Sequence, residues 1–328
     1  MKAIVCHEIG PLEGLRYEDV PDPKPVAGQV LIGVRACGLN FPDVLVVQGK
    51  YQFKAPPPFT PGGEVSGVVE AVGSGVTDLK VGDRVVAVVM GGGLAEKMVA
   101  DASQVHRLPD GIDFATASCV LMAYGTALHA LRDRAAMRAG ETLLVTGAAG
   151  GVGLAAVQIG KKLGARVIAA ASTAQKLETA RKHGADLLVN YATEDLKERV
   201  KSLTDGQGAD VVFDPVGGPY TEQALRATAR KGRVLIVGFT AGEIPRIPTN
   251  LVLLKDAALV GVFWGVNMMH DPVGGRAQLQ EILGWVKDGS LRPYIQAKYL
   301  LPQAVEALRD IEQRRAQGRI VVVTGGEA

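Results

Sequence analysis

The chain of 328 residues is longer than one ordinary domain, and its content of 47% apolar and 21% charged residues is typical of a globular protein. It carries 36 basic and 34 acidic residues, a formal net charge of +2, without a basic block or stripe. This balance disfavours nucleic acid as the main partner and favours a small molecule or another protein chain.

The cysteines indicate a reducing environment. Cys6, Cys37 and Cys119 are widely separated and form neither a C-x-x-C pair nor an even framework for disulfides. The first residues have a strand-like pattern and lack the apolar core of a signal peptide. We therefore expect a cytoplasmic protein.

Two apolar stretches, residues 143–160 and 251–269, have about the length of a membrane span. The first is rich in glycine and alanine and contains Gln158, and the second is interrupted by Lys255 and Asp256. These interruptions favour buried globular segments, so we expect no membrane partner.

The first part of the chain, to about residue 118, is expected to be all-β with many turns. Runs rich in valine and isoleucine, bounded by glycine, proline and aspartate, predict strands at residues 2–5, 29–37, 64–72 and 84–89. The proline-rich connections at 21–25 and 56–58 cannot continue a sheet and are expected to be loops. Strands this closely spaced predict a small, partly closed β-barrel.

From about residue 119 the pattern alternates between strand and helix. It predicts strands at 142–146, 166–170, 187–189, 211–214 and 234–237, with helices at 152–163 and 175–183. Such alternation is typical of βαβ units, and it predicts an α/β domain with a doubly wound parallel sheet.

In the C-terminal part, from about residue 265, the pattern predicts a helix at 276–288, a strand near 295–299, a helix from residue 303 and a last strand at 319–324. We expect this part to pack back on the β domain. A discontinuous catalytic domain, residues 1–120 and 265–328, would then flank a nucleotide-binding domain, residues 121–264.

The apolar run at residues 257–264 predicts the last strand of the parallel sheet. An apolar edge strand that is left open invites pairing with another chain. We therefore expect a homodimer joined edge to edge.

A glycine-rich segment, GAAGGVG at residues 147–153, follows a predicted strand and opens a predicted helix. Glycine lets the backbone approach a diphosphate closely, and the helix N-terminus supplies free N–H groups and a positive dipole end. The glycines could instead only ease strand–helix packing. Their place in a multi-strand α/β pattern favours dinucleotide binding.

The end of the next strand favours NADPH over NADH. Sites for NAD usually place an acidic residue about 20 residues after the turn, to hold the ribose 2′-hydroxyl. Here Ser172 and Thr173 follow the strand, with Lys176 just beyond, and these could bind a 2′-phosphate. Ser172 and Thr173 could also cap the next helix while Lys176 is solvated, and both roles are compatible.

Several motifs together resemble one family. They are CGLNFPD at 37–43, PGGEVSG at 61–67, VGDRV at 81–85, GTAL at 125–128, the glycine-rich turn, NY at 190–191 and DPVGG at 214–218. Essentially end to end, the chain resembles the zinc-free quinone oxidoreductase (zeta-crystallin-like) branch of the medium-chain dehydrogenase/reductase superfamily. The resemblance implies a GroES-like, partly open β-barrel catalytic domain and a Rossmann domain. Gly147 stands where the family has alanine, a change that removes only a methyl group.

The resemblance also shows a departure from zinc-dependent relatives. Asn40 stands at the position of their cysteine ligand and Gly63 at that of their histidine, which leaves only Glu64. A catalytic zinc needs three protein ligands. The cysteine-rich lobe that holds structural zinc is missing too, so we expect no metal.

The resemblance assigns cofactor contacts to single residues. It implies Asn40 and Thr126 beside the nicotinamide, and Gly150, Gly151 and Val152 at the diphosphate. Further implied contacts are Ser172, Lys176 and Tyr191 at the adenosine phosphate, Gly238 and Phe239 at the nicotinamide ribose, and Phe263, Gly265 and Arg319 where the site closes. Each has an alternative: Asn40 could only hold a turn, Thr126 could cap or bend a helix, and Tyr191 could be a packed surface ring.

The expected reaction is hydride transfer from NADPH to a quinone, because without zinc an alcohol oxygen is not polarised by a Lewis acid. The alternatives are an enone or an unsaturated acyl-CoA as acceptor, or, in another class, a crystallin-like or RNA-binding protein that binds NADPH without turnover. The candidate catalytic residues are Asn40, Tyr51 and Thr126. Asn40 would order the nicotinamide–substrate contact, and Tyr51 would contact the reduced oxygen or donate a proton, although it could equally line a loop.

Overall fold

The computed structural model describes residues 1–324, which form two compact units. Unit 1 joins Met1–Met122 to the segment that starts at Glu281, and unit 2 comprises Ala123–Gln280. The second boundary lies later than residue 265, where the sequence placed it. Trp264 and Gln278, both buried, lie in the sequence range of unit 2.

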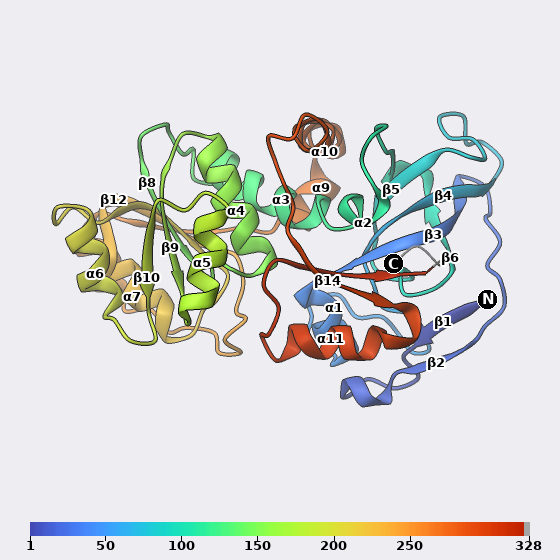
Figure 1. Cartoon of the computed structure of the whole chain (residues 1–328), viewed down its shortest axis with the longest axis horizontal. Helices are drawn as coiled ribbons and strands as arrows, with labels where there is room; N and C mark the ends of the chain where they lie inside the picture. Colours follow the sequence, from blue (N-terminus) through green and yellow to red (C-terminus); the bar gives the residue numbers. More distant parts are fainter. Residues whose placement is uncertain (325–328) are drawn as a thin grey trace. The chain divides into compact units, whose positions relative to one another are not determined.

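Unit 1 is built on a seven-stranded sheet and a short two-stranded ribbon (Figure 1). The ribbon pairs β1 (Lys2–Val5) with β2 (Arg16–Asp19) in antiparallel register. The main sheet runs in the order β14 (Ile295–Leu300), β15 (Arg319–Val323), β3 (Gln29–Leu39), β4 (Glu64–Val72), β5 (Arg84–Val88), β7 (Val105–Arg107), with β6 (Lys97–Asp101) on β3. Strand β3 pairs with β4, β6 and β15 at different parts of its length. It therefore joins the N-terminal and C-terminal segments of unit 1 into the GroES-like barrel that the sequence predicted.

Short helices interrupt the part of unit 1 that was expected to be all-β. They are α1 (Phe41–Val47) and α2 (Phe114–Ala117), and near the C-terminus α11 (Ala304–Glu312) covers the barrel. Helix α1 begins at Asn40, whose backbone N–H donates to the Asp43 side chain at 2.7 Å, with Pro42 in the first turn. This capping box, with proline in the first turn, begins a helix inside the part of the chain that was expected to be all-β.

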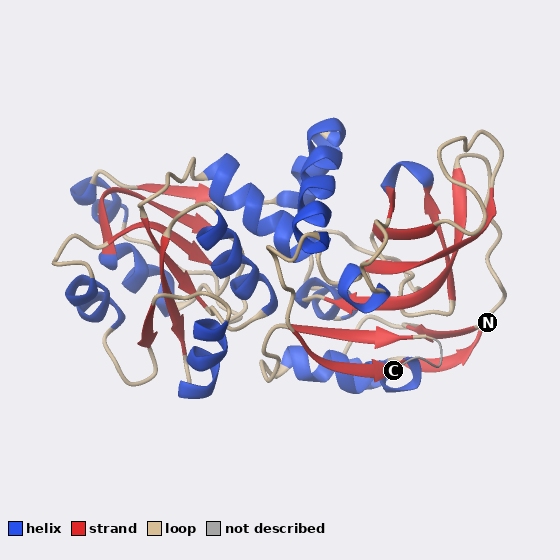
Figure 2. Ribbon diagram, turned by 45° about the horizontal axis from the view of Figure 1, so that its top comes forward, coloured by secondary structure: helices blue, strands red, loops and turns tan. Residues whose placement is uncertain are grey.

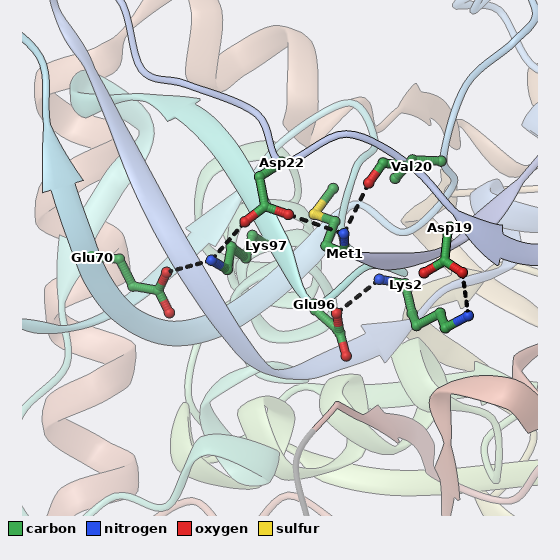
Figure 3. A network of polar contacts seen from close by, with 8 residues as sticks. All are labelled: Met1, Lys2, Asp19, Val20, Asp22, Glu70, Glu96 and Lys97. Carbon is green, nitrogen blue, oxygen red and sulfur yellow. Dashed lines mark hydrogen bonds and ion pairs between the residues drawn. The ribbon is translucent and has the colours of Figure 1, made fainter.

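A polar network fastens the N-terminal ribbon to the barrel (Figure 3). The Met1 ammonium group donates to the Val20 carbonyl at 2.9 Å and to the Asp22 carboxylate at 3.0 Å. Lys97 of β6 pairs with Asp22 at 2.8 Å and with Glu70 of β4 at 3.4 Å. These ion pairs are largely exposed, so each stabilises the fold only slightly.

Unit 2 contains a six-stranded parallel sheet with helices on both faces (Figure 2). Its order is β10 (Leu187–Asn190), β9 (Arg166–Ala171), β8 (Thr142–Thr146), β11 (Ala209–Asp214), β12 (Thr228–Ile236), β13 (Ala258–Gly261). The connecting helices are α4 (Gly151–Lys162), α5 (Ala174–Lys182), α6 (Leu196–Leu203), α7 (Pro219–Ala227) and α8 (Thr249–Lys255). The order reverses between β8 and β11, the point where ligands bind outside the carboxyl ends of such sheets.

The central strands of this sheet are fully buried, as expected for a parallel sheet covered on both faces. Leu143, Leu144 and Val145 of β8 have no exposed surface, and neither have Val211, Val212 and Phe213 of β11. This core fixes the strand ends that carry the predicted cofactor residues.

The edge strand β13 is shorter than the run 257–264 that predicted it. Trp264 instead begins helix α9 (Trp264–His270), which α10 (Pro272–Lys287) follows. The apolar pattern could not show this, since a short run of apolar residues fits a buried strand and a buried helix alike. Within residues 1–324, no helix combines the length and apolar character that crossing a bilayer requires.

Candidate functional site

The glycine-rich turn lies at the carboxyl end of β8 and leads into α4. Gly147 adopts a positive φ of 57°, which favours glycine, and the turn ends at Gly150, the N-cap of α4. The first N–H groups of a helix have no intrahelical acceptor, and no side chain caps those of α4. The structure thus places Gly151 and Val152 where free N–H groups and the helix dipole favour an anion.

The turn has the shape that a diphosphate needs. A Cβ atom at Gly153 would lie 2.3 Å from the Gly147 carbonyl oxygen, so helix and turn are in close contact. A Cβ at Gly150 would meet only that oxygen, at 3.4 Å, which leaves room above the turn. A dinucleotide diphosphate therefore fits this part of the chain.

Asp214, at the end of β11, organises the neighbouring loop and was given no role by the sequence. Its carboxylate is buried and accepts hydrogen bonds from Thr146 Oγ1 at 2.6 Å and Thr221 Oγ1 at 2.6 Å. The backbone N–H groups of Val216 and Gly217 also donate to it, at 3.0 and 3.2 Å. Asp214 therefore ties the end of β8, just before the glycine-rich turn, to the loop after β11.

The residues predicted at the adenosine phosphate gather at the ends of β9 and β10, which are neighbours in the sheet. Ser172 and Thr173 follow β9, and Tyr191 follows β10, where its ring packs on Tyr220 with centroids 4.4 Å apart. Thr173 Oγ1 accepts the Lys176 backbone N–H at 3.2 Å, so this hydroxyl caps α5, the alternative that the sequence had left open. Ser172 and Lys176 carry a hydroxyl and an ammonium group, which are of the kind that binds phosphate.

The residues of unit 2 predicted near the nicotinamide lie on three segments. Gly238 and Phe239 follow β12, and Phe263 and Gly265 flank the start of α9 after β13. Thr126 lies half-buried in α3 (Leu121–Leu128). The segments after β12 and β13 share the carboxyl edge of the sheet with the glycine-rich turn.

In unit 1, Asn40, Glu64 and Arg319 form a buried polar cluster. Arg319 donates to Glu64 Oε2 at 2.8 Å and to Asn40 Oδ1 at 2.7 Å, and Asn40 Nδ2 donates to Glu64 Oε2 at 3.0 Å. The Met122 backbone N–H occupies the second Glu64 oxygen at 3.0 Å. Burial raises the pKa of Glu64, although Arg319 and the hydrogen bonds oppose this.

The cluster uses the polar groups of two predicted site residues, Asn40 and Arg319. The amide of Asn40 is fully used, because Nδ2 also donates to the Gly38 carbonyl at 3.2 Å. Arg319 was expected where the cofactor site closes, but its guanidinium group is bound to Glu64 and Asn40. These bonds hold both side chains in fixed positions.

Asp43 joins this cluster, and sequence reasoning gave it no role. Its carboxylate accepts the backbone N–H groups of Asn40 and Gly63, and burial raises its pKa from 3.8 to about 6. Burial and the nearby Asp43 charge also raise the pKa of Tyr51, whose ring packs 6.0 Å from that of Phe53. The signal for Asp43 was the spacing of three residues from Asn40, the pattern of a capping box.

The position of the missing zinc ligand is closed by backbone. A Cβ atom at Gly63 would lie 2.8 Å from the Val89 carbonyl oxygen, so a histidine does not fit there without a shift. In residues 1–324, no three side chains of histidine, cysteine, aspartate or glutamate converge in a way that could hold a metal ion.

Comparison with known proteins agrees with this two-part architecture. Residues 26–110 match the family described as alcohol dehydrogenase GroES-like domain, and residues 151–284 match the family described as zinc-binding dehydrogenase. Fold and site thus define a two-domain dehydrogenase or reductase of the GroES-like and Rossmann type.

Individual relatives show to which branch of these dehydrogenases and reductases the chain is similar. The chain is 41% identical to a quinone oxidoreductase-like protein 2 homolog of Nematostella vectensis, over 98% of this chain and 89% of that protein. It is 36% identical to a quinone oxidoreductase of Pseudomonas aeruginosa, over 98% and 99%. The crystal structure of Escherichia coli quinone oxidoreductase complexed with NADPH superposes with a TM-score of 0.89 at 30% identity, covering 98% and 100%. The chain belongs to the quinone oxidoreductase branch of the medium-chain dehydrogenase/reductase superfamily, and it is an oxidoreductase.

Proposed function

We propose that this protein reduces a quinone with NADPH by hydride transfer, without a metal ion. The observation that supports the proposal most directly is the set of residues at the carboxyl edge of the parallel sheet. There an uncapped helix N-terminus follows β8, and the next strand, β9, ends in Ser172 and Thr173 instead of an acidic residue. The Escherichia coli relative that was crystallised with NADPH supports the same cofactor.

The residues of unit 2 would divide the cofactor between them. The N–H groups of Gly151 and Val152 would bind the diphosphate, and Ser172 and Lys176 the 2′-phosphate, while Tyr191 would pack beside the adenosine. When bound, NADPH supplies a hydride, which together with a proton reduces a quinone to a hydroquinone and leaves NADP⁺. The protein contributes alignment of the two reactants.

The proposal of a metal-free reaction is supported by the buried cluster of unit 1. Glu64 is the one ligand position that is kept from the zinc-dependent relatives, and both of its oxygens accept hydrogen bonds. The positive charge beside it is the Arg319 guanidinium group. A quinone is electrophilic enough to accept hydride without a Lewis acid.

The proton is proposed to come from Tyr51 or from water. A tyrosine hydroxyl is protonated at neutral pH and can donate, and the pKa of Tyr51 is raised further by burial and the nearby Asp43 charge. Tyr51→Phe should lower kcat by about tenfold or more with a quinone, since a positioned proton donor contributes about 10²-fold or more. Tyr17→Phe, which changes an exposed tyrosine of β2, should leave kcat unchanged.

A substrate panel tests the function as a whole. With NADPH in excess, initial rates are measured with 1,4-benzoquinone, short enones and crotonyl-CoA. The proposal predicts the highest kcat/KM for the quinone. A higher value for an enone or for crotonyl-CoA would establish the alternative reductase, and NADPH binding without turnover of any acceptor would establish a non-enzymatic role.

We also propose that two copies pair through β13. It is an edge strand of its sheet, and Leu259 on it is 39% exposed. Leu253 and Leu254 of the preceding helix α8 are 78% and 77% exposed, an apolar surface that a second chain would cover. Light scattering at micromolar concentration should show a dimer, and Leu254→Glu should shift it to a monomer. A monomeric wild-type protein would contradict the proposal.

A further inference from the structure

Trp264 occupies the junction between β13 and α9. Its side chain is buried, at 5% exposure, whereas its neighbours Phe263 and Gly265 are exposed. These neighbours are two of the residues proposed to lie near the nicotinamide. A buried anchor between two exposed contact residues fixes where both of them lie.

The indole of Trp264 packs directly against α3. A Cβ atom at Gly125 would lie 2.6 Å from Cε2, 2.7 Å from Cζ2 and 2.9 Å from Nε1 of the indole. Any larger residue at position 125 would push the indole away. Gly125 immediately precedes Thr126, so the indole sets the distance between the turn that carries Thr126 and the segment that carries Phe263.

A chain of polar contacts, buried at Trp264 and Gln278 and reaching the surface at Asp133, fixes the orientation of the indole. Trp264 Nε1 donates to Gln278 Oε1 at 2.9 Å, and Gln278, which is 4% exposed, donates through Nε2 to Asp133 Oδ2 at 3.4 Å. The same Asp133 oxygen lies 3.0 Å from His129 Nδ1. Both residues belong to the π-helical turn His129–Arg134 that continues α3, a type of turn frequent at functional sites.

We infer that Trp264 is a positioning residue that sets the orientation of the nicotinamide ring. Its indole contacts Gly125 and so fixes Thr126, the next residue. Through the backbone, Trp264 also fixes its neighbours Phe263 and Gly265, so one side chain aligns three residues proposed to contact the nicotinamide. Gln278 holds the indole in place through Nε1. This inference rests on the proposed function, in which NADPH binds at this edge of unit 2.

The inference predicts that Trp264 affects hydride transfer more than cofactor affinity. The diphosphate turn and the residues after β9 and β10 belong to other segments of unit 2, so they would keep most of the binding energy. In Trp264→Phe, kcat with a quinone should fall about tenfold to a hundredfold, because small displacements of reacting atoms have effects of this size. The Kd for NADPH should stay within about threefold of the wild type.

Two readouts separate positioning from a merely structural role. The first is the primary isotope effect on kcat with NADPH deuterated at C4, which should increase as hydride transfer becomes rate-limiting. The second is the stereochemistry of transfer from 4R- and 4S-deuterated NADPH, which should become less specific when the ring is held loosely. A structural defect alone would lower the active fraction and the melting temperature, and leave both readouts unchanged.

Gln278→Leu provides a second test if Trp264→Phe folds poorly, because it keeps the indole and removes only its anchor. It should change the same readouts in the same direction, by a smaller factor. Trp285→Phe changes the other tryptophan, in unit 1, and is the matched control that should behave like the wild type.

The outcomes of the inference and of the proposed function are distinguishable. A wild-type protein that neither binds nor oxidises NADPH overturns the proposed function, and the inference with it. If the wild type turns over while Trp264→Phe and Gln278→Leu keep its kcat, isotope effect and stereochemistry, only the inference is overturned.

Discussion

The buried ion pair between Arg319 and Glu64 gives the sharpest stability prediction. The side chains are 6% and 0% exposed, and their nearest atoms are 2.8 Å apart. Arg319→Met keeps an apolar stem of similar length but removes the charge. It leaves Glu64 buried with a negative charge that no cation balances, and it leaves Asn40 Oδ1 without its donor.

Removing one partner of a buried ion pair usually destabilises a protein by about 3–5 kcal/mol. We expect this range for Arg319→Met at pH 8. The matched control in unit 1 is Arg107→Met, whose partner is Asp83 and whose side chain is 60% exposed. The control should lower the free energy of unfolding by about 1 kcal/mol or less.

The sign of the pH dependence follows from the pKa of Glu64. Burial raises this pKa in the folded protein, and Arg319 opposes the rise, so Arg319→Met should raise it further. A carboxyl group with a raised pKa destabilises the fold as pH rises through its titration range. The loss in Arg319→Met should therefore be largest at pH 8 and smaller at pH 5.

The assay is urea unfolding followed by far-UV circular dichroism at both pH values. The double variant Arg319→Met/Glu64→Gln should recover part of the loss, because it also removes the unbalanced charge. If Arg319→Met loses no more stability than Arg107→Met at pH 8, the cluster does not depend on a buried ionised pair, and our description of it is wrong.

Three further predictions concern single residues. Asn40→Ala should lower kcat more than NADPH affinity, as steady-state kinetics and fluorescence titration would show; unchanged turnover would remove Asn40 from the mechanism. The pKa of Asp43 is raised to about 6, so its ionisation destabilises the fold between about pH 4 and pH 6, and melting curves of Asp43→Asn should lack this decline. A decline equal to the wild type would assign the titration to another group. Gly153→Ala should weaken NADPH binding at least tenfold, because its Cβ would lie 2.3 Å from the Gly147 oxygen. Gly284→Ala, whose Cβ would have nothing within 4 Å, is the control that should bind NADPH normally. Equal NADPH affinities of the two variants would show that the turn does not hold the cofactor.

Much of the fold could be predicted from the sequence because the signals were local. Strands β4 (Glu64–Val72) and β8 (Thr142–Thr146) begin and end at the predicted residues, since glycine and polar residues bound each apolar run. The helix at α1 was missed because its signal was the short capping pair Asn40 and Asp43, within a part of the chain that the strand pattern assigned to an all-β region.

The start of α9 was missed for a different reason. An apolar run continues through Phe263 and Trp264, and its residues are compatible with a strand. What ends the strand is tertiary: the indole packs on Gly125, far away in the sequence. Periodicity contains no information on such a contact.

The candidate site could be predicted in part. The glycine-rich turn was recognisable because a diphosphate requires that local geometry. The bonding of Asn40, Glu64 and Arg319 could not be derived, because the three residues come from distant parts of the chain and meet only in the folded barrel. For Asp214 only the bond from Thr146 joins distant parts of the chain, since its other three donors lie within seven residues of it.

The central claim is metal-free reduction of a quinone by NADPH. The most direct test measures NADPH oxidation with 1,4-benzoquinone, before and after exhaustive dialysis against a strong chelator, with metal content determined on the same samples. We predict equal turnover in both samples and no stoichiometric metal in either. Turnover that is lost on chelation and restored by Zn²⁺ would contradict the account.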